Sequence, residues 1–220
     1  MDHQTITKAI IRSQHCQRNW DLSREIPEDD INLLATAATQ CPSKQNVAFY
    51  NLHFITNRSL IEQIHATTDG FGSAYASTVN NAQTQTNSQT LANLLIVFET
   101  NNYLNNVDKD SILRNQATLD FFMSKDSLSK ETLERDKNMA IGVAAGYLNL
   151  TASLLGYNTG CCICFDVASV QKILNIENNI NLLMGIGFKN PNLNRRVHHT
   201  NQNFVFPTKA KQPIKITHHR

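Results

Sequence analysis

The 220-residue sequence lacks several features that would assign its class at once. Its first residues contain no apolar segment of the kind found in signal peptides, and no Pro-, Gly- or Ser-rich linker divides the chain. The formal net charge is only +2, and the basic residues are scattered rather than gathered along one helix. We therefore expect one domain over residues 1–220, without a nucleic-acid partner.

Cysteines and long apolar runs are also scarce. The five cysteines are an odd number, which disfavours a disulfide-stabilised scaffold, so we expect a reducing cytoplasm. The most apolar segment is interrupted by Asn138, Asn149 and Thr151, which leaves no uninterrupted block long enough for a bilayer. A buried helix is therefore the better interpretation of that segment, and we expect no membrane span.

The segment 138–165 is the most informative part of the chain. Large and small apolar residues recur there every three or four positions, which is the period of a helix. These residues are Met139, Val143, Ala144, Tyr147, Leu150, Leu154 and Leu155. The other faces are apolar as well, which predicts a helix buried on all sides. Gly142 and Gly146 keep one flank thin, and Gly156 is placed to end the helix in the left-handed conformation.

The rest of the chain alternates between helical and strand patterns. Apolar or alternating runs predict strands at residues 49–56, 92–99, 159–165 and 181–188, with a fifth candidate at 214–217. The continuous apolar run at 92–99 is typical of a central strand. Helical periods cover residues 5–13, 31–38, 59–65 and 167–174, and 101–136 carries short helical patterns. This order predicts an α+β or α/β domain with a mixed sheet packed by helices on both sides.

Two groups of polar residues suggest a ligand. His15 and Arg18 follow the first helix, and Arg195 with Arg196 follow the fourth strand; guanidinium groups at loop ends suit a phosphate. Solvated surface arginines are the alternative. The loop containing Pro42, Ser43, Lys44 and Asn46 can offer backbone and side-chain donors to a polar ring edge. A turn without a ligand is the alternative there.

The cysteine cluster has the spacing C-x-x-C from Cys161 to Cys164, which is compatible with zinc or thiol redox chemistry. Zinc needs further ligands, and the sequence has no second C-x-x-C and no H-x-x-x-H. On a strand, Cys162 and Cys164 would share one face, so we favour buried small side chains. Phosphate-loop and dinucleotide glycine fingerprints are absent as well.

Taken in order, these segments resemble the FMN-dependent nitroreductase-like family over about residues 5–197. Residues 15–20 are similar to its early R/H-S-x-R/K-x-aromatic signature, and residues 37–46 to its A-x-x-P-S-x-x-N loop. Residues 146–157 resemble its central helix with a closing L-G-aromatic. Residues 185–188, followed by Arg195 and Arg196, resemble its late strand and basic phosphate contact.

The resemblance implies an α+β fold with a central sheet of four to five strands, and a homodimer whose interface includes the central helix. It further implies one FMN at each of two subunit-interface sites, reduced by NADH or NADPH. His15, Cys16, Arg18, Arg195 and Arg196 would hold the phosphate and pyrimidine side. Pro42, Ser43, Lys44 and Asn46 would come from the other subunit. The backbone of Ile163 and Cys164 would face the flavin N5 region, and Asn81, Gln83 or Gln85 would reach the uracil-like edge.

The expected activity is ping-pong hydride transfer from the nicotinamide to a small acceptor such as a nitroaromatic or a quinone. No side chain is assigned as an acid, and no metal is expected. Residues 101–136 would cover the site, and residues 198–220 would form a tail that embraces the partner subunit. Gln14, Ala48 and Cys164 depart from the family pattern. These departures favour one rival interpretation, a flavin-binding protein without turnover. A cysteine-dependent redox or metal protein that uses Cys161 and Cys164 is the other.

Overall fold

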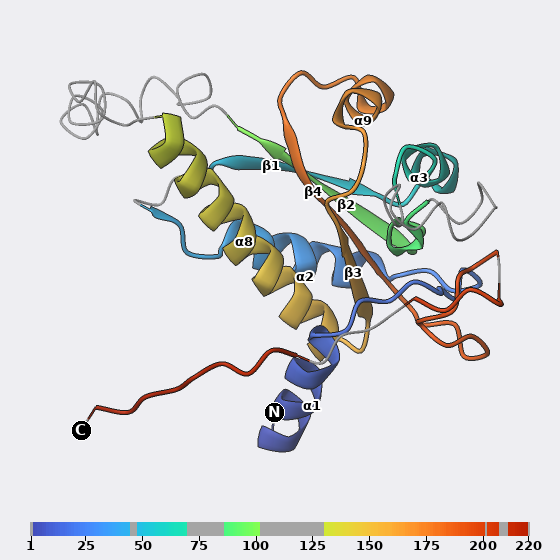
Figure 1. Ribbon diagram of the computed structural model, residues 1–220, viewed down its shortest axis with the longest axis horizontal. Coiled ribbons are helices and arrows are strands. Elements are labelled where there is room, and N and C mark those ends of the chain that lie inside the picture. Colours follow the sequence, from blue (N-terminus) through green and yellow to red (C-terminus); the bar gives the residue numbers. More distant parts are fainter. Residues whose placement is uncertain are drawn as a thin grey trace.

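The computed structural model describes residues 2–44, 48–69, 86–101, 130–200, 202–206 and 211–219. It has an α+β fold, in which helices cover both faces of a four-stranded sheet (Figure 1). The helices are α1 (His3–Ser13), α2 (Glu28–Thr39), α3 (Arg58–His65), α8 (Lys130–Leu154) and α9 (Val167–Leu174), with a 3-10 turn η3 (Ser88–Thr90). The strands are β1 (Tyr50–Ile55), β2 (Leu94–Thr100), β3 (Asn158–Cys162) and β4 (Ile180–Gly187).

The sheet has the order β1-β2-β4-β3, and all three strand pairings are antiparallel. The parallel component expected of a mixed sheet is a single bridge between Cys16 and Thr159, which extends the β3 edge. Every residue of β2 is buried, because the strand has a neighbour on each side and helices on each face. The prediction of a central strand at residues 92–99 is therefore confirmed.

A hydrophobic layer lies on each face of the sheet. Successive side chains of β2 point alternately into one layer and the other. Leu94, Ile96 and Phe98 face α2 and α8, whereas Leu95 and Val97 face α3 and α9. All five side chains are fully buried. Strands covered on both faces lose the polar alternation of a half-exposed strand, which explains the continuous apolar run in the sequence.

Helix α8 differs from its sequence prediction in two respects. It begins at Lys130, eight residues before Asn138, so residues 130–136 belong to it. It also buries only one face in the single chain, through Ile141, Ala144, Leu148 and Ala152. The opposite face exposes four large apolar side chains: Met139, Val143, Tyr147 and Leu150. The helix ends as predicted, because Gly156 follows it with a φ of +94°.

Two predicted strands are absent or shorter in the structure: the candidate near the end of the chain and the strand that contains the cysteines. Residues 211–219 contain no strand, so the candidate at 214–217 is wrong; Ile214 and Ile216 are both 75% exposed. Strand β3 stops at Cys162, where its pairing with Leu183 of β4 ends. None of the helices in the described ranges combines the length and apolar content needed to cross a membrane.

Candidate functional site

The predicted phosphate segment lies along the edge of β3. The Gln17 N–H donates to Thr159 O at 2.7 Å. A side chain at Gly160 would place its Cβ 2.7 Å from Gln17 O, so glycine is needed for this close approach. The Gln17 side-chain oxygen accepts from the N–H groups of Arg18 and Asn19 at 3.0 and 3.2 Å. This buried glutamine therefore fixes the turn from which Arg18 projects.

Arg18 and Arg195 come together although 176 residues separate them in the sequence. The Arg195 Nη1 donates to Cys16 O at 3.4 Å. Burial lowers the pKa of Arg18, and the nearby charge of Arg195 lowers it further while Cys16 raises it. Within the described ranges, no carboxylate lies within ion-pair distance of either arginine. Half-buried guanidinium groups without a counter-charge are costly, which favours an anionic ligand.

A buried amide sits beside this cluster. With the Gln89 amide oriented to satisfy both of its polar atoms, its oxygen accepts from Arg18 Nη2 at 3.2 Å and its nitrogen donates to Cys161 O. Gln89 belongs to η3, which packs against β4 so closely that a Cβ at Gly185 would lie 2.1 Å from Gln89 O. The two glycines of β4 thus admit protein rather than a ligand, because Gly187 makes room for the Asn93 side chain.

The remaining residues of the predicted phosphate group take other positions. Arg196 turns into the last loop, where its Nε donates to Phe206 O at 3.1 Å. His15 is exposed just after α1. The structure therefore brings Cys16, Arg18 and Arg195 together, with Arg196 one residue away in the chain but directed elsewhere.

Gln89 connects the end of β3 to Arg18, since its amide contacts Cys161 O as well as Arg18. Ile163 and Cys164 follow directly after this strand end. Ile163 is 75% exposed, and Cys164 is exposed. Cys164 O accepts from the Asp69 N–H at 2.8 Å. Only Cys162 of this cluster is buried, so the expectation that Cys162 and Cys164 share a buried face is wrong. In the part of the chain that the structure describes, no three His, Cys, Asp or Glu side chains are arranged so that they could hold a metal ion.

The loop assigned to the other subunit lies at the opposite end of α8. Lys44 Nζ forms an ion pair with Asp136 at 2.6 Å, and Asp136 also contacts Arg135. At the other end, Arg12 Nη1 donates to Ser153 O at 3.3 Å. Ser153 lies seventeen positions after Asp136, which is roughly 25 Å at the helical rise. Pro42 is exposed and Ser43 half-buried; Asn46, Asn81, Gln83 and Gln85 lie outside the described residues.

Sequence reasoning missed a cluster of three imidazoles next to the arginines. The ring centres of His198 and His199 are 4.5 Å apart, and those of His65 and His199 are 5.4 Å apart. Burial lowers the pKa of His65 and of His199 to about 4. His65 belongs to α3, whereas His198 and His199 belong to the last loop. In the sequence, only the adjacency of His198 and His199 pointed to this cluster.

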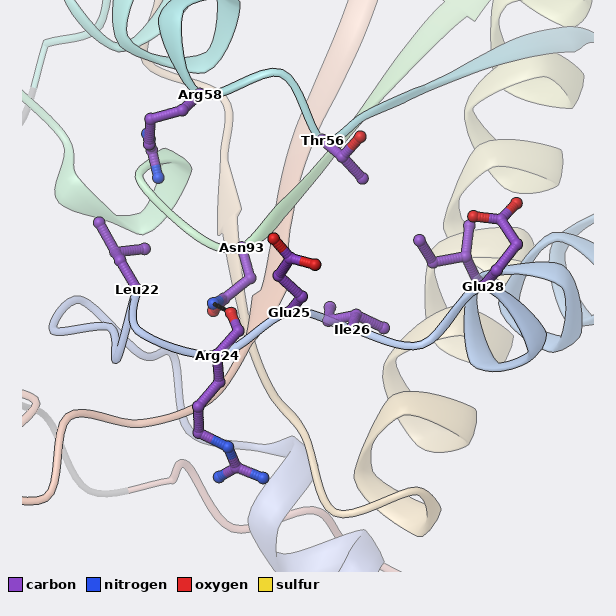
Figure 2. Close-up of a pocket in the computed structure, with 9 residues that line it drawn as sticks. Leu22, Arg24, Glu25, Ile26, Glu28, Thr56, Arg58 and Asn93 are labelled. Carbon is purple, nitrogen blue, oxygen red and sulfur yellow. Dashed lines mark hydrogen bonds between the residues drawn. The ribbon is translucent and has the colours of Figure 1, made fainter.

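A separate hollow of about 420 Å³ lies before α2, among Leu22, Arg24, Glu25, Ile26, Glu28, Ile31, Thr56, Arg58 and Asn93. Figure 2 shows the Arg24 side chain directed away from the other lining residues. Its guanidinium carbon lies 3.5 Å from the centre of the Phe188 ring. Arg58 Nη1 donates to Leu91 O and Ala92 O, and its Nε pairs with Glu62. Both cations are thus held by protein groups, and no predicted flavin residue lines this hollow.

The model of the nitroreductase family matches residues 11–188, which include the whole sheet, the arginine-bearing turn and α8. The chain belongs to the nitroreductase family. No curated protein sequence matches it significantly.

Solved structures show the same fold at low sequence identity. An NAD(P)H:FMN oxidoreductase from Staphylococcus epidermidis aligns with a TM-score of 0.65 at 19% identity, covering 94% of this chain and 92% of its own. The nitroreductase ydfN of Bacillus subtilis aligns with a TM-score of 0.67 at 14% identity, covering 96% and 97%. A nitroreductase from Exiguobacterium sibiricum, solved in complex with FMN, aligns with a TM-score of 0.65 at 15% identity, covering 88% and 93%. Identities this low establish the nitroreductase fold alone.

Proposed function

We propose that this nitroreductase-family chain is an FMN-dependent oxidoreductase driven by NADH or NADPH. The observation that carries the proposal is the pair Arg18 and Arg195, which are half-buried without a carboxylate partner in the described part of the chain. FMN is anionic through its phosphate, and guanidinium groups bind phosphate by matched donor geometry. The family and the FMN-bound relative support this choice of anion.

The residues of the proposed site suit two parts of FMN, the phosphate with the pyrimidine side and the ring. Arg18, Arg195 and the backbone near Cys16 would hold the phosphate and the pyrimidine side. The backbone of Ile163 and Cys164, which follows the strand end that Gln89 connects to Arg18, would line the ring. When bound, FMN supplies hydride transfer, and the protein orients the ring and excludes water. No side chain needs to donate a proton, so we assign none as an acid.

The site would be completed by a second copy of the chain. Pro42, Ser43 and Lys44 belong to the proposed site, but Lys44 contacts α8 at Asp136, whereas the chain that leads to Arg18 contacts it through Arg12 at Ser153, roughly 25 Å further along the helix. A homodimer packed through the exposed apolar face of α8 would bring the loop of one subunit to the arginines of the other. A methyl group on Gly142 or Gly146 would meet no described atom within 4 Å, which leaves this face open to a partner helix.

Access and acceptor choice would depend on segments at the edge of this site. Of the excursion expected at 101–136, residues 130–136 belong to α8 and residues 102–129 lie outside the described residues. We propose that the acceptors are small molecules such as nitroaromatics or quinones. Of the tail expected at 198–220, residues 198–200 and 202–206 pack against their own chain, so we propose the extended segment 211–219 as the arm towards the partner subunit (Figure 1).

The visible spectrum of the purified protein, after reconstitution with FMN and removal of free cofactor, tests this proposal. We expect a stoichiometric flavin spectrum, bleaching by NADH or NADPH without oxygen, and recovery of the colour on adding a quinone or a nitroaromatic. A yellow protein that neither nicotinamide bleaches would indicate flavin binding without turnover. A colourless protein whose redox activity disappears in Cys164→Ser would contradict the proposal.

A further inference from the structure

The last loop of the described chain is built onto the turn that carries Arg18. Asn19 Nδ2 donates to Asn194 O and to Val197 O, both at 2.7 Å. The loop closes as a hairpin, in which the His198 N–H donates to Phe204 O and the Phe206 N–H donates to Arg196 O, at 2.9 and 2.7 Å. The hairpin 196–206 and the Arg18 turn therefore form one hydrogen-bonded unit.

Phe206 is the point at which this hairpin touches the candidate cofactor site. The Arg18 guanidinium carbon lies 4.5 Å from the centre of the Phe206 ring. The ring is 1% exposed and is held by Phe204, whose ring meets it edge-on at 5.1 Å, and by His198 at 5.7 Å. A rigid aromatic face beneath a guanidinium attracts the cation and also restricts the plane in which its N–H groups point.

The contacts on Arg18 leave its charge available to a ligand. The ring of Phe206 covers one face of the guanidinium, and the neutral Gln89 amide takes one Nη2 hydrogen. Neither contact neutralises the positive charge, whereas a carboxylate would. The environment of Arg18 thus combines a fixed orientation with an uncompensated charge, which is what electrostatic stabilisation of an anion requires.

We propose that Phe206 is a positioning residue, which holds Arg18 in the orientation that favours the more negatively charged, reduced form of bound FMN. The inference rests on the proposed function, since it assigns Phe206 a role towards the same cofactor. On this proposal, the reduction potential of bound FMN depends on Phe206, although Phe206 need not touch FMN.

The first measurement needs no cofactor. In the NMR spectrum of the FMN-free protein, the side-chain signals of Arg18 should show the upfield ring-current shift of a cation stacked on an aromatic face. Phe206→Leu should abolish this shift, and Phe204→Leu, which removes a ring from the same hairpin, should preserve most of it. An Arg18 signal without a ring-current shift in the wild-type protein would overturn the proposal.

The second measurement is the midpoint potential of bound FMN in a double-mutant cycle of Phe206→Leu and Arg18→Met. We expect Phe206→Leu to weaken binding of reduced FMN about tenfold more than binding of oxidised FMN, which lowers a two-electron potential by about 30 mV. In the Arg18→Met background, Phe206→Leu should have no further effect, because its action passes through Arg18. Phe206→Tyr should restore the potential, since it keeps the aromatic face.

The outcomes separate this inference from the proposed function. Bound FMN with an unchanged potential in Phe206→Leu, or equal effects in both backgrounds, would overturn the positioning role and leave the oxidoreductase proposal standing. A wild-type protein that binds no FMN would overturn the proposed function, and the role of Phe206 towards that cofactor with it, even where the ring-current shift is present.

Discussion

The two ends of α8 hold their cations in opposite ways. At the carboxyl end, Arg18 and Arg195 are half-buried and contact a ring, an amide and a carbonyl. At the amino end, Lys44 is more exposed and pairs with the buried Asp136. A guanidinium without a counter-charge needs an anion to offset its burial, whereas a paired lysine does not. The carboxyl end is therefore the part that would select an anionic cofactor, and the amino end would supply contacts of lower net charge.

The same comparison explains why one chain would not suffice. The two ends are separated by the length of the helix, so a single flavin could touch both only if a second chain were packed in the opposite sense. The exposed apolar face between the two ends supplies a surface for that packing. Variants that separate the chains, remove the free cations or alter the paired one should therefore have effects of decreasing size.

The largest effect is expected from separating the chains with Tyr147→Glu. Tyr147 is 46% exposed in the single chain, so the fold should tolerate the change. At a dimer interface, an unpaired buried carboxylate costs roughly 3–5 kcal/mol, which is more than 100-fold in FMN affinity if the site needs both chains. Light scattering should show a monomer, and FMN titration should show loss of binding.

A matched control for this experiment is Leu22→Glu, which places the same charge at a leucine that is 51% exposed in the loop before α2. This variant should keep the mass and the FMN affinity of the wild-type protein. A Tyr147→Glu protein that is monomeric yet binds FMN with wild-type affinity would show that one chain contains a complete site.

The next largest effect should come from removing an uncompensated cation. Arg18→Met should weaken FMN binding by about 10- to 100-fold, because hydrogen bonds to charged groups contribute roughly 1.5–3 kcal/mol. Lys44→Met should weaken it by less, since Asp136 already offsets the lysine charge. Isothermal titration at two salt concentrations would compare them, and equal losses would remove the distinction between the two ends.

The sequence predicted the helices and strands of this fold better than it predicted which of their faces are buried. The strand β2 and the helix α8 were recognisable because their apolar patterns are long and regular. The same pattern could not distinguish a core face from an exposed face that awaits a partner, so Met139 and Tyr147 were expected to be buried. The helical pattern at 132–137 was recognised but was not joined to the helix that follows, because residues 130–137 are mostly charged and carry little apolar signal.

The candidate site shows the same limit. No pattern within the sequence joins Arg18 to Arg195, and only the family resemblance placed them together. The glycines of the strand at 181–188 indicated a close approach by a backbone or a ligand, and at Gly185 it is the backbone of Gln89 that approaches. The stacking of Phe206 on Arg18 and the imidazole cluster depend on side chains from segments far apart in the chain, which periodicity does not report.

A smaller effect is expected when the paired lysine is made to resemble the free arginines. Asp136→Asn removes the counter-charge of Lys44 and should lower the free energy of unfolding by roughly 0.5–1 kcal/mol, as for a partly exposed ion pair. It should also strengthen FMN binding, by no more than about fivefold on the same scale. Chemical denaturation and FMN titration would measure the two effects, and Asp136→Asn combined with Lys44→Met should restore the affinity of Lys44→Met alone. A gain that persists in the double variant would mean that Asp136 acts on FMN directly.

The last difference should appear as the pH falls, because the two ends of the sheet carry different titrating groups. Near Arg18, burial holds the pKa of His65 and His199 at about 4 against an ordinary 6.5, so the unfolded chain takes up protons first and stability falls between these values. At the other end, burial raises the pKa of Glu99, but hydrogen bonds from Asn178, Asn51 and His53 lower it more, to a net value below the ordinary 4.5. Its contribution is therefore present above pH 4.5 and is lost only below it.

Hydrogen exchange at pH 7 and pH 5 should show the hairpin 196–206 losing protection while residues 97–100 keep theirs. Replacing His65 and His199 with glutamine should remove this difference, and equal loss of protection at both ends would show that the imidazoles do not control the acid response.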